Sequence, residues 1–358
     1  MSKIRFNDEQ TGREVWRMTH DESVSFAPYM YRRAFSQDER YLVYSSDATG
    51  KREVWRVALE DGDAQPLTDA DDYSSMSMIL TVDSAGHEAW FIDGTTIAAV
   101  EIETGRNRSV VDLGTLTGGK PTISMMLSPD AEQVLVSFVR KEDGRQAVAL
   151  APTHGLASAE EVYAWDPEVS AITHLLFSPT EPGTITYNRH PDRQNDFTCT
   201  ESERARCWKL NLETGSDVPF LTVPTGYRAT HEYWAADGSR LYFHQKTQPG
   251  WIPAMICSIP RDGGPITEHY RNDTVKLGHS SVSTDQAWMV SDSQEPGQNP
   301  LLLINPSDGT AETLCWPNAS GAPHPNHVHP SFSPSGRYIV YTSDVTGTAQ
   351  VYVVPLMA

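Results

Sequence analysis

The chain has 358 residues, of which 39% are hydrophobic and 21% charged, a composition typical of a globular protein with a large core. Its formal net charge of -19 at pH 7 argues against nucleic acid and anionic membranes as partners. The sequence shows no apolar run of about 18 residues and no secretory leader, so we expect no membrane span and a cytoplasmic location.

The first predicted element is a strand over 12–19 (GREVWRMT), which reads as an outer strand although no inner strand precedes it. From there on, one pattern recurs: an apolar residue, a Ser or Thr, a polar turn and alternating strands. The copies begin at Phe35, Leu80, Leu127, Phe177, Trp234, Val282 and Phe332. Seven copies spaced by roughly 45–55 residues indicate an all-β, seven-bladed β-propeller with four strands in each blade.

We interpret 1–358 as a single propeller domain with blades beginning near 32, 77, 124, 174, 231, 279 and 329. The last copy has only three strands, so the strand at 12–19 is expected to complete it and close the ring. Within the blades, 59–68 (LEDGDAQPLT) and 212–222 (LETGSDVPFLT) predict hairpins between the outer strands, with Gly at the positive φ of the turn. The one candidate helix is 156–165. A β-sandwich or two smaller barrels is the alternative fold.

In a propeller, the first strand of each blade starts at one rim of the central channel. The residues three positions before the apolar starts are Arg32, Ser77, Ser124, His174, His231, His279 and His329. Four consecutive copies thus carry histidine at one strand position, in a chain with only 12 histidines. Channel histidines that merely satisfy hydrogen bonds are the alternative, and four at one register make a shared site the better interpretation.

The C-terminal segment GAPHPNHVHPSF adds two more imidazoles, His324 and His327, beside His329. On an extended segment His327 and His329 point the same way with Cα atoms about 6.5–7 Å apart. Two imidazoles at that spacing can bind one ion at roughly 2.0–2.2 Å. His279 is the expected third ligand and His324 a possible fourth. Nitrogen ligands without thiolate suit Mn, Fe, Co, Ni or Zn better than Ca or Mg.

At these residues the chain resembles the oligogalacturonate lyases, which are intracellular seven-bladed propellers that cleave short pectin fragments by β-elimination. The resemblance lies in the motifs RARCWKLNLETG, THEYWAADGSRLYF, GHSSVSTD and HPNHVHPSFSP, with YMYRRAFSQDERYLVYSSD in the opening blade. It implies a manganese ion held by His279, His327 and His329. Where the family has a glutamine as fourth ligand this chain has His324, which shifts the preference towards Zn, Ni or Co.

The resemblance also implies that His231 is the catalytic base and Arg206 the active-site arginine. In β-elimination the base removes the C5 proton of a uronate, and a Lewis acid on the adjacent carboxylate stabilises the charge that develops. A neutral imidazole near pKa 6.5 suits the base, and a guanidinium suits a carboxylate or the leaving oxygen. Arg206 in a structural salt bridge is the alternative.

We expect an acidic oligosaccharide as the substrate, with further contacts from Arg32, His174, Arg189 and Arg193. The last two lie in a basic loop that could equally be solvated. Two other functions stay open: a lyase for a different uronate-containing glycan, and a non-catalytic propeller that binds a protein. A serine hydrolase is set aside because no G-x-S-x-G motif occurs. The sequence carries no signal of oligomeric state.

Overall fold

A computed structural model of the chain describes residues 2–20, 22–69, 79–117, 124–155, 157–169, 172–189, 200, 203–297 and 299–356. These residues form seven sheets, one for each predicted repeat, and the prediction of an all-β, seven-bladed propeller is confirmed. Ser77, Arg193 and the other residues outside these ranges are not described.

Four blades have their strands in chain order, from the first strand to the outermost. Blade 1 contains β3 (Ser25–Phe26), β4 (Tyr41–Ser46), β5 (Glu53–Ala58) and β6 (Ala64–Pro66). Blade 4 contains β16 (Thr173–Phe177), β17 (Thr184–Asn188), β18 (Cys207–Asn211) and β19 (Asp217–Leu221). Blade 5 contains β20 (Tyr227–Trp234), β21 (Arg240–Thr247), β22 (Ala254–Pro260) and β23 (Thr267–Asn272). Blade 6 contains β24 (Leu277–Val282), β25 (Met289–Ser293), β26 (Leu301–Asn305) and β27 (Thr310–Cys315).

Blades 2 and 3 differ in their outer strands. Blade 2 contains β7 (Thr81–Val82), β8 (Glu88–Asp93), β9 (Thr96–Glu101) and β10 (Asn107–Asp112), with β14 (Ala157–Ser158) added in parallel to β10. A short helix, α1 (Gly114–Thr117), follows β10. Blade 3 contains β11 (Met125–Leu127), β12 (Gln133–Val139), β13 (Gln146–Pro152) and β15 (Glu160–Ala164).

The candidate helix over 156–165 is therefore wrong, because β14 and β15 occupy most of this range. Tyr163 on β15 pairs with Val148 on β13, and the ladder continues to Glu160 opposite Leu150. Ala and Glu favour a helix locally, but completing the outer edge of blade 3 satisfies a row of backbone groups and overrides that propensity.

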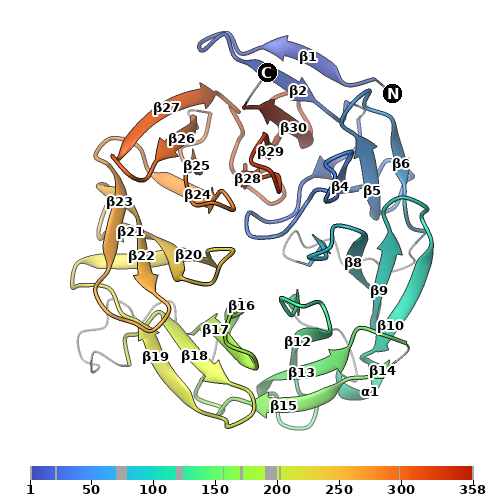
Figure 1. Ribbon diagram of the computed structural model, residues 1–358, viewed down its shortest axis with the longest axis vertical. Coiled ribbons are helices and arrows are strands. Elements are labelled where there is room, and N and C mark those ends of the chain that lie inside the picture. The colour runs from blue at the N-terminus through green and yellow to red at the C-terminus, as the bar shows by residue number, and fades with distance from the viewer. Residues whose placement is uncertain are drawn as a thin grey trace. The chain divides into compact units, whose positions relative to one another are not determined.

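Blade 7 is built from both ends of the chain. Its strand order is β1 (Ile4–Asn7), β2 (Glu14–Arg17), β30 (Gln350–Pro355), β29 (Tyr338–Ser343) and β28 (Ser331–Phe332). Trp16 pairs with Val353 and Arg17 with Tyr352, so the strand expected at 12–19 does complete the last blade. Figure 1 shows β1 and β2, coloured blue, beside the red β30.

Asp8, in the turn between β1 and β2, fastens this hairpin to the end of blade 6. Its Oδ1 accepts from the Thr11 N–H at 2.9 Å, and its Oδ2 accepts from the Trp316 N–H, also at 2.9 Å. Thr11 Oγ1 in turn donates to the Leu314 carbonyl at 2.8 Å. A carboxylate that accepts from backbone N–H groups on two segments is a strong tether, because each bond is charge-assisted.

Apolar side chains from adjacent blades make the core. Between blades 7 and 1 the buried cluster includes Trp16, Phe35, Leu42, Val340 and Val353. The hairpin turn between β5 and β6 adds a close approach. Gly62 has φ +81°, and a Cβ there would lie 2.2 Å from the backbone nitrogen of Lys3, so only glycine fits.

Backbone contacts divide the chain into two compact units. Unit 1 comprises Met1–Gly94, Ala98–Arg108 and Val275–Ala358, and unit 2 comprises Thr95–Ile97 and Ser109–Thr274. Unit 1 contains blades 1, 6 and 7, and unit 2 contains blades 3, 4 and 5. The single-domain boundary of 1–358 stays a prediction. Within the described residues, the helical part falls short of the length and hydropathy that a bilayer span requires.

Glu39 links blade 1 to blade 7 inside unit 1. Its carboxylate is 2% exposed and accepts from the Ser335 N–H at 2.7 Å, from Ser335 Oγ at 2.9 Å and from the Arg337 guanidinium at 2.8 Å. All of these partners are donors, so the buried site requires an acceptor on both carboxylate oxygens.

We predict that Glu39→Gln lowers the free energy of unfolding by about 1–3 kcal/mol, because the amide NH₂ would face other donors without a partner. Urea denaturation followed by tryptophan fluorescence measures the change. The matched control is Glu312→Gln, which removes the exposed ion pair with Arg13 (3.0 Å) and should cost far less. Equal losses in the two variants would contradict this role of Glu39.

Candidate functional site

The first strands of blades 4, 5 and 6 each contain a β-bulge at the register position of the histidines. Two residues lie opposite one in each case: His174 and Leu175 opposite Tyr187, His231 and Glu232 opposite Phe243, and Gly278 and His279 opposite Asp292. His174 and His231 each take the first position of the bulged pair, whereas His279 takes the second, so the register predicted from the repeats is exact for the first two and shifted by one residue within the bulge for His279. A bulge bends the strand and redirects a side chain, which is why bulges gather beside active sites.

Three of the register histidines have a left-handed backbone: φ is 51° at His174, 59° at His231 and 45° at His329. An L-residue with a side chain rarely adopts this conformation, and it costs of order 1–3 kcal/mol. Backbone strain of this kind persists where the surrounding structure fixes it. Here it occurs at three of the histidine positions that the repeat pattern predicts to be functional.

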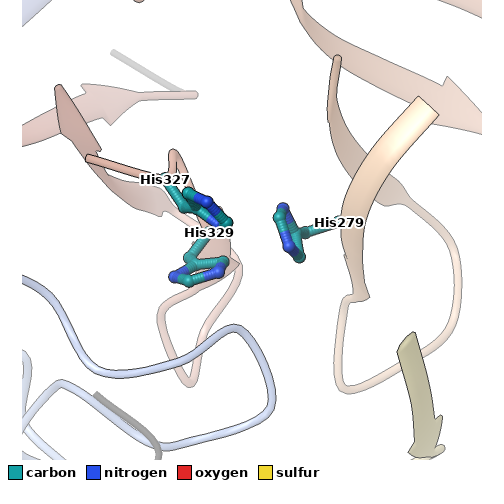
Figure 2. A group of neighbouring side chains, drawn as sticks. All are labelled: His279, His327 and His329. Atoms are coloured by element: carbon teal, nitrogen blue, oxygen red, sulfur yellow. The ribbon is translucent and has the colours of Figure 1, made fainter. Parts of the chain in front are cut away.

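His279, His327 and His329 converge within unit 1. One nitrogen from each ring lies within 4.8 Å of the corresponding nitrogens of the other two. The ring centroids are 4.2 Å apart for His279 and His329, and 5.2 Å apart for His327 and His329. Figure 2 shows the His279 ring facing the other two rings across a gap. Rings that meet in this way can donate three nitrogens to one ion.

The route by which these rings converge differs from the sequence prediction. His327 and His329 were expected to alternate on an extended strand, but residues 324–330 have no strand structure and β28 begins at Ser331. The left-handed φ of 45° at His329 turns its side chain instead. The segment is rich in proline, which removes the backbone donors that a strand ladder needs.

Burial favours the neutral form of His327 and His329. His279 and His329 are each 3% exposed. Burial lowers the pKa of the His327 imidazole to about 4 and the pKa of the His329 imidazole well below its ordinary value, and the neighbouring histidines add to both effects. A neutral imidazole is the form that ligates a metal, because its lone pair is available.

The donor atoms also fit a metal. His327 Nδ1 and His329 Nε2 are buried and make no hydrogen bond in the described part of the chain. A buried nitrogen without a partner is costly, and a cation bound between the rings would remove that cost. An all-nitrogen set suits Mn, Fe, Co, Ni or Zn. The residues present therefore fit a divalent metal.

His324 stacks on the triad at its outer side. Its ring centroid is 3.8 Å from that of His327, with 34° between the planes, and 5.3 Å from that of His329. Burial lowers the pKa of His324, and the charge of His279 lowers it further. Its nitrogens are not among those that meet within 4.8 Å. The fourth-ligand role of His324 stays a prediction.

Two neighbours of the triad are not apparent from the sequence. The Tyr29 ring, 5% exposed, lies 4.5 Å from the His329 ring and 6.0 Å from the His279 ring. Asp292 on β25 lies 3.1 Å from His279 Nδ1. The available signal was an aspartate in the strand MVSDS, all of whose residues are buried, because a carboxylate at a buried strand position needs a partner.

A second buried cluster lies within unit 2, where blades 4 and 5 meet. Arg206 Nε is 2.7 Å from Glu232 Oε1, and the two side chains are 6% and 1% exposed. Asn188 Nδ2 donates to Glu232 Oε2 at 2.6 Å. Burial alone would raise the pKa of Glu232, but the Arg206 guanidinium and, to a smaller degree, His174 hold it below its usual value. Glu232 thus anchors Arg206 on the strand that carries His231.

The other predicted substrate contacts lie in less regular places. Arg32 lies between β3, which ends at Phe26, and Phe35, which forms an isolated antiparallel bridge with Leu42. Arg32 is 3% exposed, and its backbone N–H donates to the backbone carbonyl of Tyr29 at 2.7 Å. Arg189 lies over the Trp208 ring, 3.1 Å from the centroid, and 3.5 Å from Asp217. Arg193 is outside the described residues. Their role in binding substrate stays a prediction.

The buried pair of Arg206 and Glu232 gives a stability prediction. Glu232→Ala should lower the free energy of unfolding by about 3–5 kcal/mol, because it leaves the Arg206 charge buried without its partner. Chemical denaturation measures the loss. Glu181→Ala is the control in the same unit: it removes a partly exposed pair with Lys209 (2.6 Å) and should cost much less. Wild-type stability of Glu232→Ala would refute the anchoring role.

Comparison with known proteins finds the same resemblance as the sequence motifs, and it extends over nearly the whole chain. No protein-family model matches the sequence. The oligogalacturonate lyase of Dickeya dadantii (strain 3937) is 24% identical over an alignment of 392 residues, which covers 97% of this chain and 94% of the relative. An oligogalacturonide lyase of Pectobacterium atrosepticum is 21% identical with the same coverage.

Among solved structures, an oligogalacturonate lyase in complex with manganese superposes with a TM-score of 0.85, covering 99% of this chain and 96% of that chain at 18% identity. This agreement confirms the fold, and the named relatives are lyases. The chain is therefore similar to the oligogalacturonate lyases over nearly its whole length, which is the resemblance that its motifs indicate.

Proposed function

We propose that the protein is a metal-dependent lyase that cleaves short oligogalacturonides by β-elimination. The observation that carries the proposal is the convergence of His279, His327 and His329 in a chain whose named relatives are oligogalacturonate lyases. Its substrate is an acidic oligosaccharide, which a strongly negative protein must attract through local positive charge rather than through its overall field.

The three imidazoles hold a divalent metal, which when bound supplies a Lewis acid for the carboxylate of the uronate. Manganese is the first candidate because a structural neighbour is a manganese complex. Zinc, nickel and cobalt are the alternatives, since His324 places a fourth imidazole beside His327. Two of the three histidines, His327 and His329, supply neutral nitrogen ligands that burial keeps unprotonated.

His231 is the proposed base. It takes the C5 proton of the uronate, and the electron pair of the C5–H bond forms the double bond between C4 and C5. The C4–oxygen bond breaks with its electrons on the oxygen of the departing sugar, which takes up a proton from water. The support is the family resemblance together with the position in a strand bulge that His231 shares with His174, in the blade that precedes along the chain the one that carries His279. Its left-handed φ of 59° sets the direction in which the side chain leaves the strand.

Arg206 is the proposed partner of a substrate carboxylate or of the leaving oxygen. Its pairing with Glu232 leaves a planar guanidinium held in one orientation, which suits bidentate recognition. The same pairing supports the structural alternative. Loss of turnover in Arg206→Lys with an unchanged urea midpoint would favour the catalytic role, because the lysine retains the charge and loses the planar fork.

Metal removal tests the proposal. Dialysis against a chelator should abolish the release of unsaturated uronate from oligogalacturonides, followed by ultraviolet absorbance, and added Mn²⁺ should restore it. His279→Ala and His327→Ala should lower both the bound metal and the turnover, because each removes a ligand. Turnover that survives complete removal of metal would rule out the proposed mechanism.

A variant of the base gives a separate test. His231→Ala should retain metal and lower kcat by about 10²–10⁴-fold, because proton abstraction loses its acceptor. The control is His154→Ala, whose exposed ring pairs with Glu132 at 3.1 Å and should leave kcat unchanged. A fully active His231→Ala enzyme would overturn the assignment.

The sugar is tested by a panel of defined uronides. We infer oligogalacturonides as substrates from the relatives, and a different uronate-containing glycan is the alternative because His324 departs from the family's glutamine. If another uronide gives the highest kcat/KM, that sugar is the substrate, and the same metal and base chemistry acts on it.

A further inference from the structure

The bulge in blade 6 differs from those in blades 4 and 5 by the residue that lies opposite. In blades 4 and 5 that residue is aromatic, Tyr187 or Phe243. In blade 6 it is Asp292, whose side chain is 2% exposed. A bulge removes one residue from the ladder and leaves its backbone groups to find other partners. Asp292 is placed where such a partner is needed.

Both oxygens of Asp292 are directed at His279. Oδ1 accepts from the His279 backbone N–H at 2.5 Å, and Oδ2 lies 3.1 Å from His279 Nδ1. An ionised carboxylate can only accept, so Nδ1 must carry the proton and donate it. The lone pair of a neutral His279 is then on Nε2. The carboxylate thereby sets both the direction and the tautomer of the ring.

Gly278 is the residue that makes room for this arrangement. A Cβ at Gly278 would lie 2.2 Å from Asp292 Oδ1 and 2.8 Å from Gln294 Cγ. Its φ is not in the left-handed region, so glycine is required here by the close approach of the carboxylate rather than by backbone conformation. Within the pair of residues that forms the bulge, Gly278 admits the carboxylate and His279 receives its hydrogen bonds.

We infer that Asp292 is a positioning residue for the metal centre, which fixes the His279 ring with Nε2 towards the ion and so sets the metal affinity. This inference deepens the proposed function and depends on His279 being a ligand. Carboxylates behind metal-bound histidines orient the ring and raise its basicity, and their loss weakens metal binding by about 10–100-fold.

The first experiment measures metal affinity in the full chain. Apo-protein is titrated with Co²⁺ against a competing chromophoric chelator, and the visible spectrum of bound Co²⁺ is recorded. Asp292→Asn should raise the Kd by about 10–100-fold and change the Co²⁺ spectrum, because an amide NH₂ in place of one oxygen would face an N–H of His279. Asn is nearly the same size, so the core around β25 stays filled.

The matched control is Asp8→Asn, which also replaces a buried carboxylate that accepts from two segments of unit 1. It should lower the thermal midpoint of the apo-protein without changing the Kd for Co²⁺. A Kd for Asp292→Asn within twofold of the wild type would overturn the inference. So would an increase of the same size in Asp8→Asn, because the effect would then be one of general destabilisation.

A second measurement uses the unmodified chain and does not depend on a variant folding. In apo-protein with ¹⁵N-labelled histidine at pH 8, the His279 ring should carry its proton on Nδ1, with the signal assigned by its absence in His279→Gln. A proton on Nε2 would overturn the inference. Wild-type protein that binds no Co²⁺ would instead refute the proposed metal site, so the two failures are distinguishable.

Discussion

The central constraint in this structure is the desolvation of three imidazoles against one another. His279 and His329 are almost completely buried, and His327 is close to both. Each ring has two nitrogens. When an imidazole is buried, each nitrogen that finds no partner in the protein costs free energy, because its hydrogen bond to water is lost. His279 satisfies one nitrogen through Asp292, whereas His327 Nδ1 and His329 Nε2 have no hydrogen-bond partner among the described residues. A cation bound between the rings would give these two nitrogens a partner. The way the rings pack therefore favours metal binding.

Buried carboxylates orient the important side chains in both units. Asp292 directs His279 in unit 1, and Glu232 holds Arg206 in unit 2. The carboxylates belong to bulged regions of blades 6 and 5, where the ladder leaves backbone or side-chain donors to be satisfied locally. The bulges therefore do two things: they redirect the histidines, and they create positions for acceptors that a regular strand would fill with apolar side chains.

The repeat pattern made most of this architecture predictable. Apolar starts and polar turns recur at a fixed spacing, and an outer strand at 12–19 without an inner partner can only complete the last blade. The same spacing aligned His174, His231 and His279. What it could not reveal was local geometry: proline and turn residues interrupt the strand before Arg32, and they keep His327 and His329 out of a strand. Asp292 was missed because its role depends on a bulge, which has no signature of its own in the sequence.

The pairing of β2 with β30 determines when the last blade can fold during synthesis of the chain. β2 lies near the amino terminus, yet its partner strand is translated only after six other blades have left the ribosome. Blade 7, which provides the segment with His327 and His329, cannot assemble on a nascent chain before that moment. The three rings thus meet last, and a truncated product lacking β30 would lose the outer strands of the blade on which two of them depend.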